Sequence, residues 1–143
     1  MSIAYQLEAD LTPAEFVDVL ERSGLAERRP LEDLRRVQVM LENSGLIVTA
    51  RSDDGILIGV SRCITDFALV CYCSDLAVDS SWQGLGIGRE LLYRSRAEAG
   101  QHCMFHLLSS PSAMSYYTHV GLEKLDMCFG IYRTSRTMPE VSA

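Results

Sequence analysis

The segment Gln83-Gly84-Leu85-Gly86-Ile87-Gly88 has the residue types and spacing best suited to binding a phosphate. Glycines at alternate positions let the backbone approach a ligand closely and present bare N–H groups to it. An apolar run that ends at Val78 precedes the segment, and an amphipathic helix pattern begins at Arg89. The N–H groups therefore fall at the positive end of a helix dipole, which favours a phosphate or pyrophosphate. A tight strand-to-helix turn would also use glycine, but three alternate glycines exceed what a turn requires.

Two common phosphate-binding motifs do not match this segment. A P-loop needs Lys and then Ser or Thr after its last glycine, whereas Gly88 is followed by Arg89. A dinucleotide-binding fingerprint that starts at Gly84 needs glycine at position 89, and one that starts at Gly86 needs glycine where Leu91 stands. The sequence thus predicts a phosphorylated cofactor held by a different kind of loop.

Two motifs in a fixed order carry a family resemblance. The first is Gln83-x-x-Gly86-x-Gly88, after a strand that ends in Leu76-Ala77-Val78-Asp79. The second is Ala113-x-x-x-Tyr117-x-x-x-Gly121-Leu122, with Tyr116 at its aromatic position. Together they resemble motifs A and B of the GNAT N-acetyltransferase superfamily, and the expected order of helices and strands agrees over nearly the whole chain.

The resemblance implies acetyl-coenzyme A as the acetyl donor and gives no reason to expect a metal. In the family, the amides of the glycine loop hold the pyrophosphate, and the preceding strand pairs with the pantetheine arm through its backbone. Ser110 stands where many members carry an Asn that contacts the cofactor arm, and its hydroxyl would replace part of that contact. The cofactor-binding residues implied in this way are Leu76, Ala77, Val78, Gln83, Gly84, Leu85, Gly86, Ile87, Gly88, Arg89, Ser110, Ala113 and Tyr116.

The reaction implied is direct acetyl transfer from the thioester to a primary amine. Tyr117 matches the family position whose hydroxyl protonates the departing thiolate, and a phenol carries its proton at neutral pH. Its place on one helical stripe with Ala113 and Val120 would equally suit core packing. The intact Tyr117 favours an enzyme over the alternative, a non-catalytic acyl-CoA-binding or sensing module of the same fold.

The general base is less clearly indicated. Tyr72 stands where some members of the family place a carboxylate, so that position carries no obvious base. Asp75 and Asp66 are the candidates, acting through a water. His106 and His119 are further candidates, although a single His on a strand or helix is usually structural. An amine of modest pKa would need no dedicated base.

The acceptor is expected to be an amine of a small molecule or peptide, and two features favour different kinds. Arg28 and Arg29, between the first two expected helices, suit a carboxylate on the acceptor, although arginines in such a loop are more often simply solvated. The net charge of -6 instead favours cationic acceptors such as polyamines or lysine side chains. A homodimer is the candidate assembly.

Hydrophobic periodicity predicts the elements that position these residues. Thr12-Pro13-Ala14-Glu15 has the form of a capping box, and Gly24 can end the helix that it begins. Further helices are expected from about Leu31 to Glu42, from the glycine loop to about Ala99, and from Ser110 to Gly121. Strands are expected over 3–7, 46–50, 56–64, 70–78, 103–108, 122–125 and 128–133. The predicted fold class is mixed α/β (α+β mixed sheet), a GNAT-like acyl-CoA N-acyltransferase fold with about six or seven strands and about four helices.

Bulk properties agree with a single domain over 1–133 and a loose polar tail over 134–143. The chain of 143 residues is 48% apolar, and its acidic balance argues against a nucleic-acid partner, because such binding relies on basic patches. No apolar run approaches the roughly 20 residues that span a bilayer. The first residues lack the regions of a signal peptide, so we expect a cytoplasmic protein without a membrane partner. The five cysteines lack the spacing of a zinc site and are expected to be buried and reduced.

Overall fold

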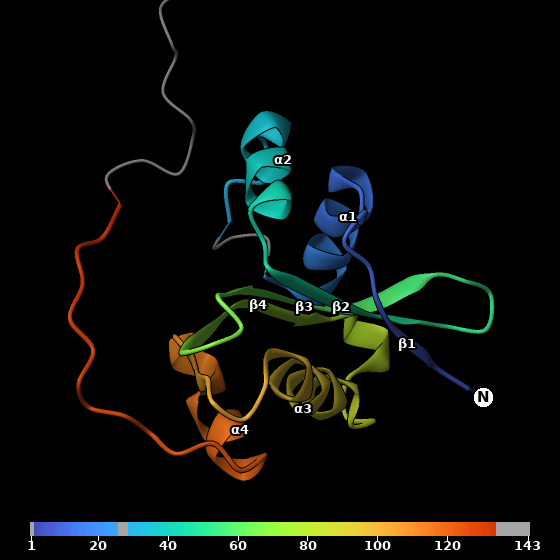
Figure 1. The fold of residues 1–143 in the computed structure, drawn as a ribbon. Helices are drawn as coiled ribbons and strands as arrows, with labels where there is room; N and C mark the ends of the chain where they lie inside the picture. Colours follow the sequence, from blue (N-terminus) through green and yellow to red (C-terminus); the bar gives the residue numbers. More distant parts are fainter. Residues whose placement is uncertain (1, 26–28, 134–143) are drawn as a thin grey trace, which may run out of the picture.

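The protein is described by a computed structural model that covers residues 2–25 and 29–133. Its five strands form one sheet in the order β1-β2-β3-β4-β5. They are β1 (Ala4–Leu7), β2 (Leu46–Arg51), β3 (Leu57–Thr65), β4 (Val70–Val78) and β5 (Met104–Leu107). Neighbouring strands are antiparallel except β4 and β5, which are parallel. Helices α1 (Pro13–Ser23) and α2 (Leu34–Glu42) lie on one face of the sheet, and α3 (Ile87–Ala99) and α4 (Met114–His119) lie on the other (Figure 1).

The helices differ in whether a side chain caps their first N–H groups, and this difference matters for the site. The Thr12 hydroxyl accepts a hydrogen bond from the Glu15 N–H at 3.2 Å, which caps α1 as the capping box predicted. Helix α2 begins after Asp33, later than predicted, because the Asp33 carboxylate accepts from the Arg36 N–H at 3.1 Å. Helix α3 begins at Ile87, and the preceding Gly86, at the capping position, has no side chain to cap it. Its first N–H groups are therefore left to another partner.

A β-bulge in β4 changes which side chains face each side of the sheet. The register against β3 shifts directly after Cys73, which leaves Ser74 as an extra residue. Before the bulge, Cys73 packs in the core beneath α3, whereas beyond it Ala77 packs in the core beneath α1 and α2. Leu76 and Val78 consequently pack against the α3 core, on the side of the glycine loop.

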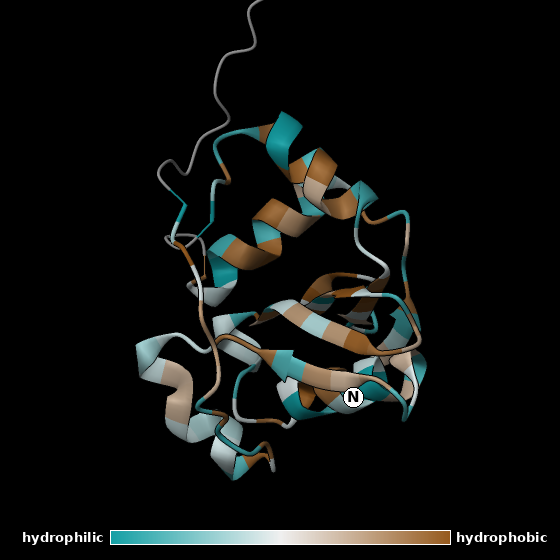
Figure 2. Ribbon diagram, turned by 60° about the vertical axis from the view of Figure 1, so that its left-hand side comes forward, coloured by the Kyte–Doolittle hydropathy of each residue, from teal (hydrophilic) through white to brown (hydrophobic). Residues whose placement is uncertain are grey.

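Two apolar cores, one on each face, hold the helices to the sheet, and Figure 2 shows the apolar residues of α1 and α2. Four cysteines are buried and unpaired, as predicted: Cys63, Cys71, Cys73 and Cys103. The fifth, Cys128, is exposed, because it lies in a segment that does not pack on the domain.

The mixed α/β class is confirmed, but the strand count was too high. Within the described residues the sheet has five strands, and the strands predicted over 122–125 and 128–133 are not formed. After α4 the chain instead follows an extended path away from the sheet (Figure 1). A strand needs a neighbouring edge for its backbone hydrogen bonds, and residue alternation alone cannot supply one.

The predicted tail over 134–143 lies outside the described residues. None of the helices in the described part of the chain has the length and apolar character needed to cross a membrane.

Candidate functional site

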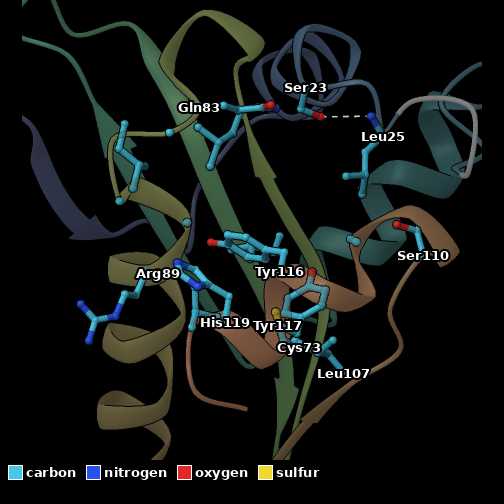
Figure 3. A pocket seen from close by; sticks show the side chains of 18 of the residues that line it. Ser23, Leu25, Cys73, Gln83, Arg89, Leu107, Ser110, Tyr116, Tyr117 and His119 are labelled. Carbon is cyan, nitrogen blue, oxygen red and sulfur yellow. Dashed lines mark hydrogen bonds between the residues drawn. The ribbon is translucent and has the colours of Figure 1, made fainter. Parts of the chain in front are cut away.

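The parallel strands β4 and β5 pair only as far as Cys73 and Leu107. Beyond Cys73, β4 continues to Val78, and its only strand partner among the described residues is β3. One edge of β4 is therefore open, and a cavity of about 580 Å³ lies beside it. Its walls come from β4, the end of β5, the start of α3 and helix α4, with the end of α1 at the rim (Figure 3).

The glycine loop directs the uncapped start of α3 toward this cavity. Gly84 and Gly86 have φ angles of 81° and 83°, in the left-handed region that favours glycine. Both line the cavity together with Ile87 and Gly88. Because the first N–H groups of a helix have no partner within it, the cavity receives both free donors and the positive end of the dipole. This geometry suits an anion such as a pyrophosphate.

Tyr116 closes over the start of α3. A β-carbon placed on Gly88 would lie 2.5 Å from the Tyr116 hydroxyl oxygen, so any larger residue at position 88 would require the Tyr116 side chain to move. Figure 3 shows the ring extending from α4 toward α3. Burial raises the pKa of Tyr116, so its hydroxyl keeps its proton at neutral pH and can donate to an anion.

Tyr117 lies beside Tyr116 on the wall of the cavity. The two rings meet edge to face, with centroids 5.3 Å apart and an interplanar angle of 75°. Tyr117 is also packed against the core beneath α3. The position is therefore compatible both with core packing and with a role in the site, because the ring packs in the core and also borders the cavity.

Asp75 does not line the cavity. Its side chain is fully buried, and each carboxylate oxygen pairs with a guanidinium group. One oxygen pairs with Arg29 and the other lies 2.5 Å from Nε of Arg62. Arg29 also donates to the Ser74 carbonyl at 2.8 Å and does line the cavity. Asp75 therefore holds the segment before α2 against β4 through these ion pairs, and it is poorly placed to take a proton from the acceptor amine.

The other candidate bases lie in different places. Tyr72 and His106 are neighbours on β4 and β5, with ring centroids 5.2 Å apart, and neither lines the cavity. Burial raises the pKa of Tyr72. Asp66 lies in the turn between β3 and β4, where hydrogen bonds from three backbone N–H groups lower its pKa to about 2. Among these candidates in the described residues, only His119 lines the cavity.

Most of the residues implied to bind the cofactor lie on the cavity wall. They are Leu76, Val78, Gln83, Gly84, Gly86, Ile87, Gly88, Arg89, Ser110, Ala113 and Tyr116. Ala77 is buried in the opposite core and Leu85 is exposed to solvent, so neither side chain reaches the cavity. The Gln83 amide donates to the Val78 carbonyl at 3.0 Å and holds the loop to the end of β4. The guanidinium of Arg89 lies over the Tyr93 ring and points away from Tyr116 and Tyr117 (Figure 3).

Several residues on the cavity wall were not identified from the sequence. They are Ser23, Leu25, Cys73, Ser74, Trp82, Leu107 and Leu108. Ser23 and Leu25 come from the distant end of α1, for which the local sequence pattern carries no signal. Leu107 and Leu108 had a usable signal, because ligands in sheets of this kind bind where neighbouring strands part at their carboxyl ends.

Comparisons with known proteins agree with this geometry. A family model described as Acetyltransferase (GNAT) domain matches residues 43–124, a range that contains the glycine loop and both tyrosines. An uncharacterised N-acetyltransferase, ycf52-like, from Prochlorococcus marinus is 34% identical over 113 residues. The match covers 75% of this chain and 60% of that protein. The chain therefore spans about three fifths of the length of this curated relative.

Solved structures share the fold. A putative acetyltransferase from Deinococcus radiodurans is 26% identical, with a TM-score of 0.74 over 96% of this chain and 94% of that one. The GNAT family N-acetyltransferase YhbS from Escherichia coli, solved in complex with CoA, is 22% identical. Its TM-score is 0.62 over 85% of this chain and 68% of that one, and this likeness concerns the fold alone.

Proposed function

The chain belongs to the GNAT acetyltransferase family, and we propose that it transfers an acetyl group from acetyl-CoA to a primary amine of a small molecule or peptide. The observation that carries this proposal is the cavity beside the open edge of β4, into which the uncapped start of α3 points. An open strand edge offers backbone groups to an extended amide-containing chain, as the pantetheine arm is. A helix N-terminus offers N–H groups to a pyrophosphate.

Each part of the cofactor has a matching part of the cavity. The backbone N–H groups around Gly84 to Arg89 would hold the pyrophosphate, and the Tyr116 hydroxyl lies next to them. The backbone of Leu76 and Val78, on the open edge of β4, would hold the pantetheine arm. When bound, acetyl-CoA supplies the thioester that the amine attacks.

The reaction then requires two proton transfers, one to the departing thiolate and one from the attacking amine. Tyr117 lies on the cavity wall, and in the proposed reaction its hydroxyl would donate a proton to the departing thiolate. The attacking amine must lose a proton, and His119 is the candidate base on the wall in the described residues. An amine of modest pKa would instead release its proton to water. Arg29 is engaged by Asp75, and Arg28 lies outside the described residues, so the acceptor is defined here only as an amine.

A second candidate function is the non-catalytic acyl-CoA-binding or sensing module. One observation favours it: within the described residues, no Asp or Glu side chain lines the cavity. Calorimetric titration with CoA and a thiol-release assay with acetyl-CoA over a panel of amines separate the two candidates. The enzyme requires both binding and amine-dependent release of thiol. Tight binding without release for any amine would support the module, and absence of binding would reject both.

A matched pair of glycines controls this experiment. Gly86 and Gly55 have φ angles of 83° and 80°, and a β-carbon on either would meet nothing within 4 Å. Gly86→Ala and Gly55→Ala should therefore lower the free energy of unfolding by a similar amount, about 1 kcal/mol. Only Gly86 lies at the cavity, so only Gly86→Ala should also weaken CoA binding. Equal CoA affinity in the two variants would place the phosphate site elsewhere.

A further inference from the structure

Arg29, in the segment between α1 and α2, reaches the cavity at the bulge of β4. Its guanidinium pairs with Asp75, donates to the Ser74 carbonyl at 2.8 Å and lines the cavity. Ser74 lies four residues before Val78, whose carbonyl accepts from the Gln83 amide of the glycine loop. Four strand residues span roughly 13 Å, so Arg29 is too far from the glycine loop to bind the same phosphate. The charge of Arg29 therefore lies at the other end of the cavity.

The β4 bulge gathers polar side chains on the sheet face that α1 and α2 cover (Figure 1). In a regular strand, Tyr72 and Asp75 would point to opposite faces because they are three residues apart. Cys73 packs in the core beneath α3, so its neighbour Tyr72 points to the opposite face. Ala77 packs beneath α1 and α2, and Asp75, two residues earlier, shares that face. The extra residue at Ser74 thus places Tyr72 and Asp75 on the same face.

Positive charge exceeds negative charge among the ion-paired side chains at the bulge. Asp75 is the shared partner of two guanidinium groups, those of Arg29 and Arg62. Their side chains are 17% and 6% exposed, and that of Asp75 is fully buried. Arg62 otherwise donates to carbonyl and hydroxyl oxygens, which carry no charge. The three side chains therefore carry one net positive charge beside the cavity, where the low dielectric strengthens its attraction for an anion.

Two further hydrogen-bonding groups lie on this face of the sheet. Burial raises the pKa of Tyr72 more than the nearby charge of Arg29 lowers it, so the phenol keeps its proton at neutral pH and can donate. The His106 ring lies against Tyr72, with centroids 5.2 Å apart. Its Nδ1 is buried and has no hydrogen-bond partner among the residues that the structure describes. Buried polar atoms are rarely left unpaired, so this nitrogen indicates a polar ligand nearby.

We propose that the acceptor amine also carries a carboxylate, as an α-amino acid does, and that Arg29 and the Tyr72 hydroxyl bind this carboxylate at the bulge of β4. The inference rests on the proposed function, because it names the class of amine that the acetyl-CoA site would serve. The pantetheine arm would run along β4 from the glycine loop toward Ser74, so its thioester would lie beside Arg29. A guanidinium has five N–H donors in one plane, more than one carboxylate uses.

The same charges disfavour a polycationic acceptor. A polyamine or a lysine side chain would bring further positive charge toward Arg29. On the part of the cavity wall that the structure describes, it would meet no Asp or Glu side chain. The net charge of -6 belongs to the whole chain and does not extend to this wall, so it is a poor guide to the acceptor.

Matched acceptors in the thiol-release assay test the proposal: the common α-amino acids, the corresponding amino-acid amides, and polyamines. Each acid and its amide share the amine and the side chain and differ in the carboxylate. At least one amino acid should have a kcat/KM about tenfold or more above that of its amide, as expected for hydrogen bonds to a charged group. The amine of the amide loses its proton more easily, so chemistry alone would favour the amide. Amides or polyamines acetylated as well as every amino acid would overturn the inference and leave the proposed function standing.

Variants of two arginines on the cavity wall assign the preference to one of them. Arg29→Gln should bring the acid-to-amide ratio of kcat/KM close to one, through the KM of the acceptor, with little change in CoA affinity. Arg29→Lys keeps a positive charge beside Asp75 and should restore part of the ratio, which a misfolded protein would not do. Arg89→Gln removes the arginine beside the glycine loop and should keep the ratio. A ratio that survives Arg29→Gln, or that falls equally with Arg89→Gln, would contradict recognition by Arg29.

Binding of the product gives a readout that needs no turnover. In calorimetric titrations of the CoA-saturated protein, an N-acetyl amino acid should bind about tenfold or more tightly than the N-acetyl amino-acid amide. Tight binding of the acid without thiol release would retain the carboxylate site and reject the enzyme. Equal binding of acid and amide, or binding of neither, would reject the carboxylate site even if amines are acetylated.

Discussion

Replacing Gly88 with Ala tests how closely Tyr116 packs on the start of α3. Inside a helix, Ala is favoured over Gly by up to about 1 kcal/mol. The new β-carbon would lie 2.5 Å from the Tyr116 hydroxyl oxygen but 3.5 Å from the ring carbon that carries it. The new β-carbon would therefore clash only with the hydroxyl oxygen and not with the ring. Tyr116→Phe should remove this clash and leave an ordinary van der Waals contact.

The expected energies follow from these distances. Overpacking costs about 1–3 kcal/mol, and Tyr116 is 37% exposed and can rotate, so the cost should fall near the lower value. Gly88→Ala alone should then change the free energy of unfolding by less than about 0.5 kcal/mol, because the helix gain and the clash nearly cancel. In the Tyr116→Phe background, the same change should stabilise the protein by close to about 1 kcal/mol. The coupling between the two positions is thus about 1 kcal/mol.

Urea unfolding of the wild type, the two single variants and the double variant measures this coupling. Tyr93→Phe is the control background, since its hydroxyl bonds to the Val120 carbonyl at 2.8 Å and not to the region of Gly88. CoA affinity should fall by about tenfold with Gly88→Ala in either tyrosine background, because a helical β-carbon points toward the N-terminus and into the anion site. A coupling of zero between positions 88 and 116 would refute the close approach of the hydroxyl.

Three further changes have defined expected outcomes. Tyr117→Phe should lower kcat in the thiol-release assay by about 10²-fold or more with little change in CoA affinity, and an unchanged kcat would reject general-acid catalysis there. The hydrogen bond from Arg51, 2.7 Å away, lowers the pKa of Glu8 from 4.5 to about 2. Because the folded-state pKa is the lower one, this pair stabilises the protein fully above about pH 4.5 and is lost as the pH falls toward 2. Glu8→Gln should therefore be less stable than the wild type in urea at pH 7, and the gap should narrow by pH 3; a constant gap would argue against the pair. Asp75→Asn leaves Arg29 and Arg62 without a counter-charge and should cost about 3–5 kcal/mol in chemical denaturation, whereas a cost near zero would contradict the buried pairing.

Local features of the fold could be predicted from the sequence because their causes are local. The capping box at Thr12 and Glu15 requires only neighbouring residues, and the structure has that hydrogen bond. The glycine loop likewise depends on φ angles that Gly84 and Gly86 adopt readily, and it forms the turn into α3 as expected.

The position of Asp75 could not be predicted in the same way. The sequence over 70–78 predicts a strand whose side chains alternate regularly between the two faces of the sheet. The extra residue at Ser74 instead exchanges the faces of all the side chains after it. Arg29, which pairs with Asp75, is 46 residues away in the sequence. Neither the bulge nor a contact over that distance is encoded in local periodicity.

The last two predicted strands were wrong within the described chain for a related reason. The apolar alternation over 127–132 is real, but a strand forms only where a partner edge is available.

Binding of CoA along the open edge of β4 is tested most directly by NMR titration of the ¹⁵N-labelled protein with CoA. The largest chemical-shift changes are expected for the amides of Gly84, Gly86, Gly88 and Arg89, followed by those of residues 74–78 in β4. Largest changes in β1 and β2, or an unperturbed spectrum at saturating CoA, would contradict a cofactor site at the start of α3.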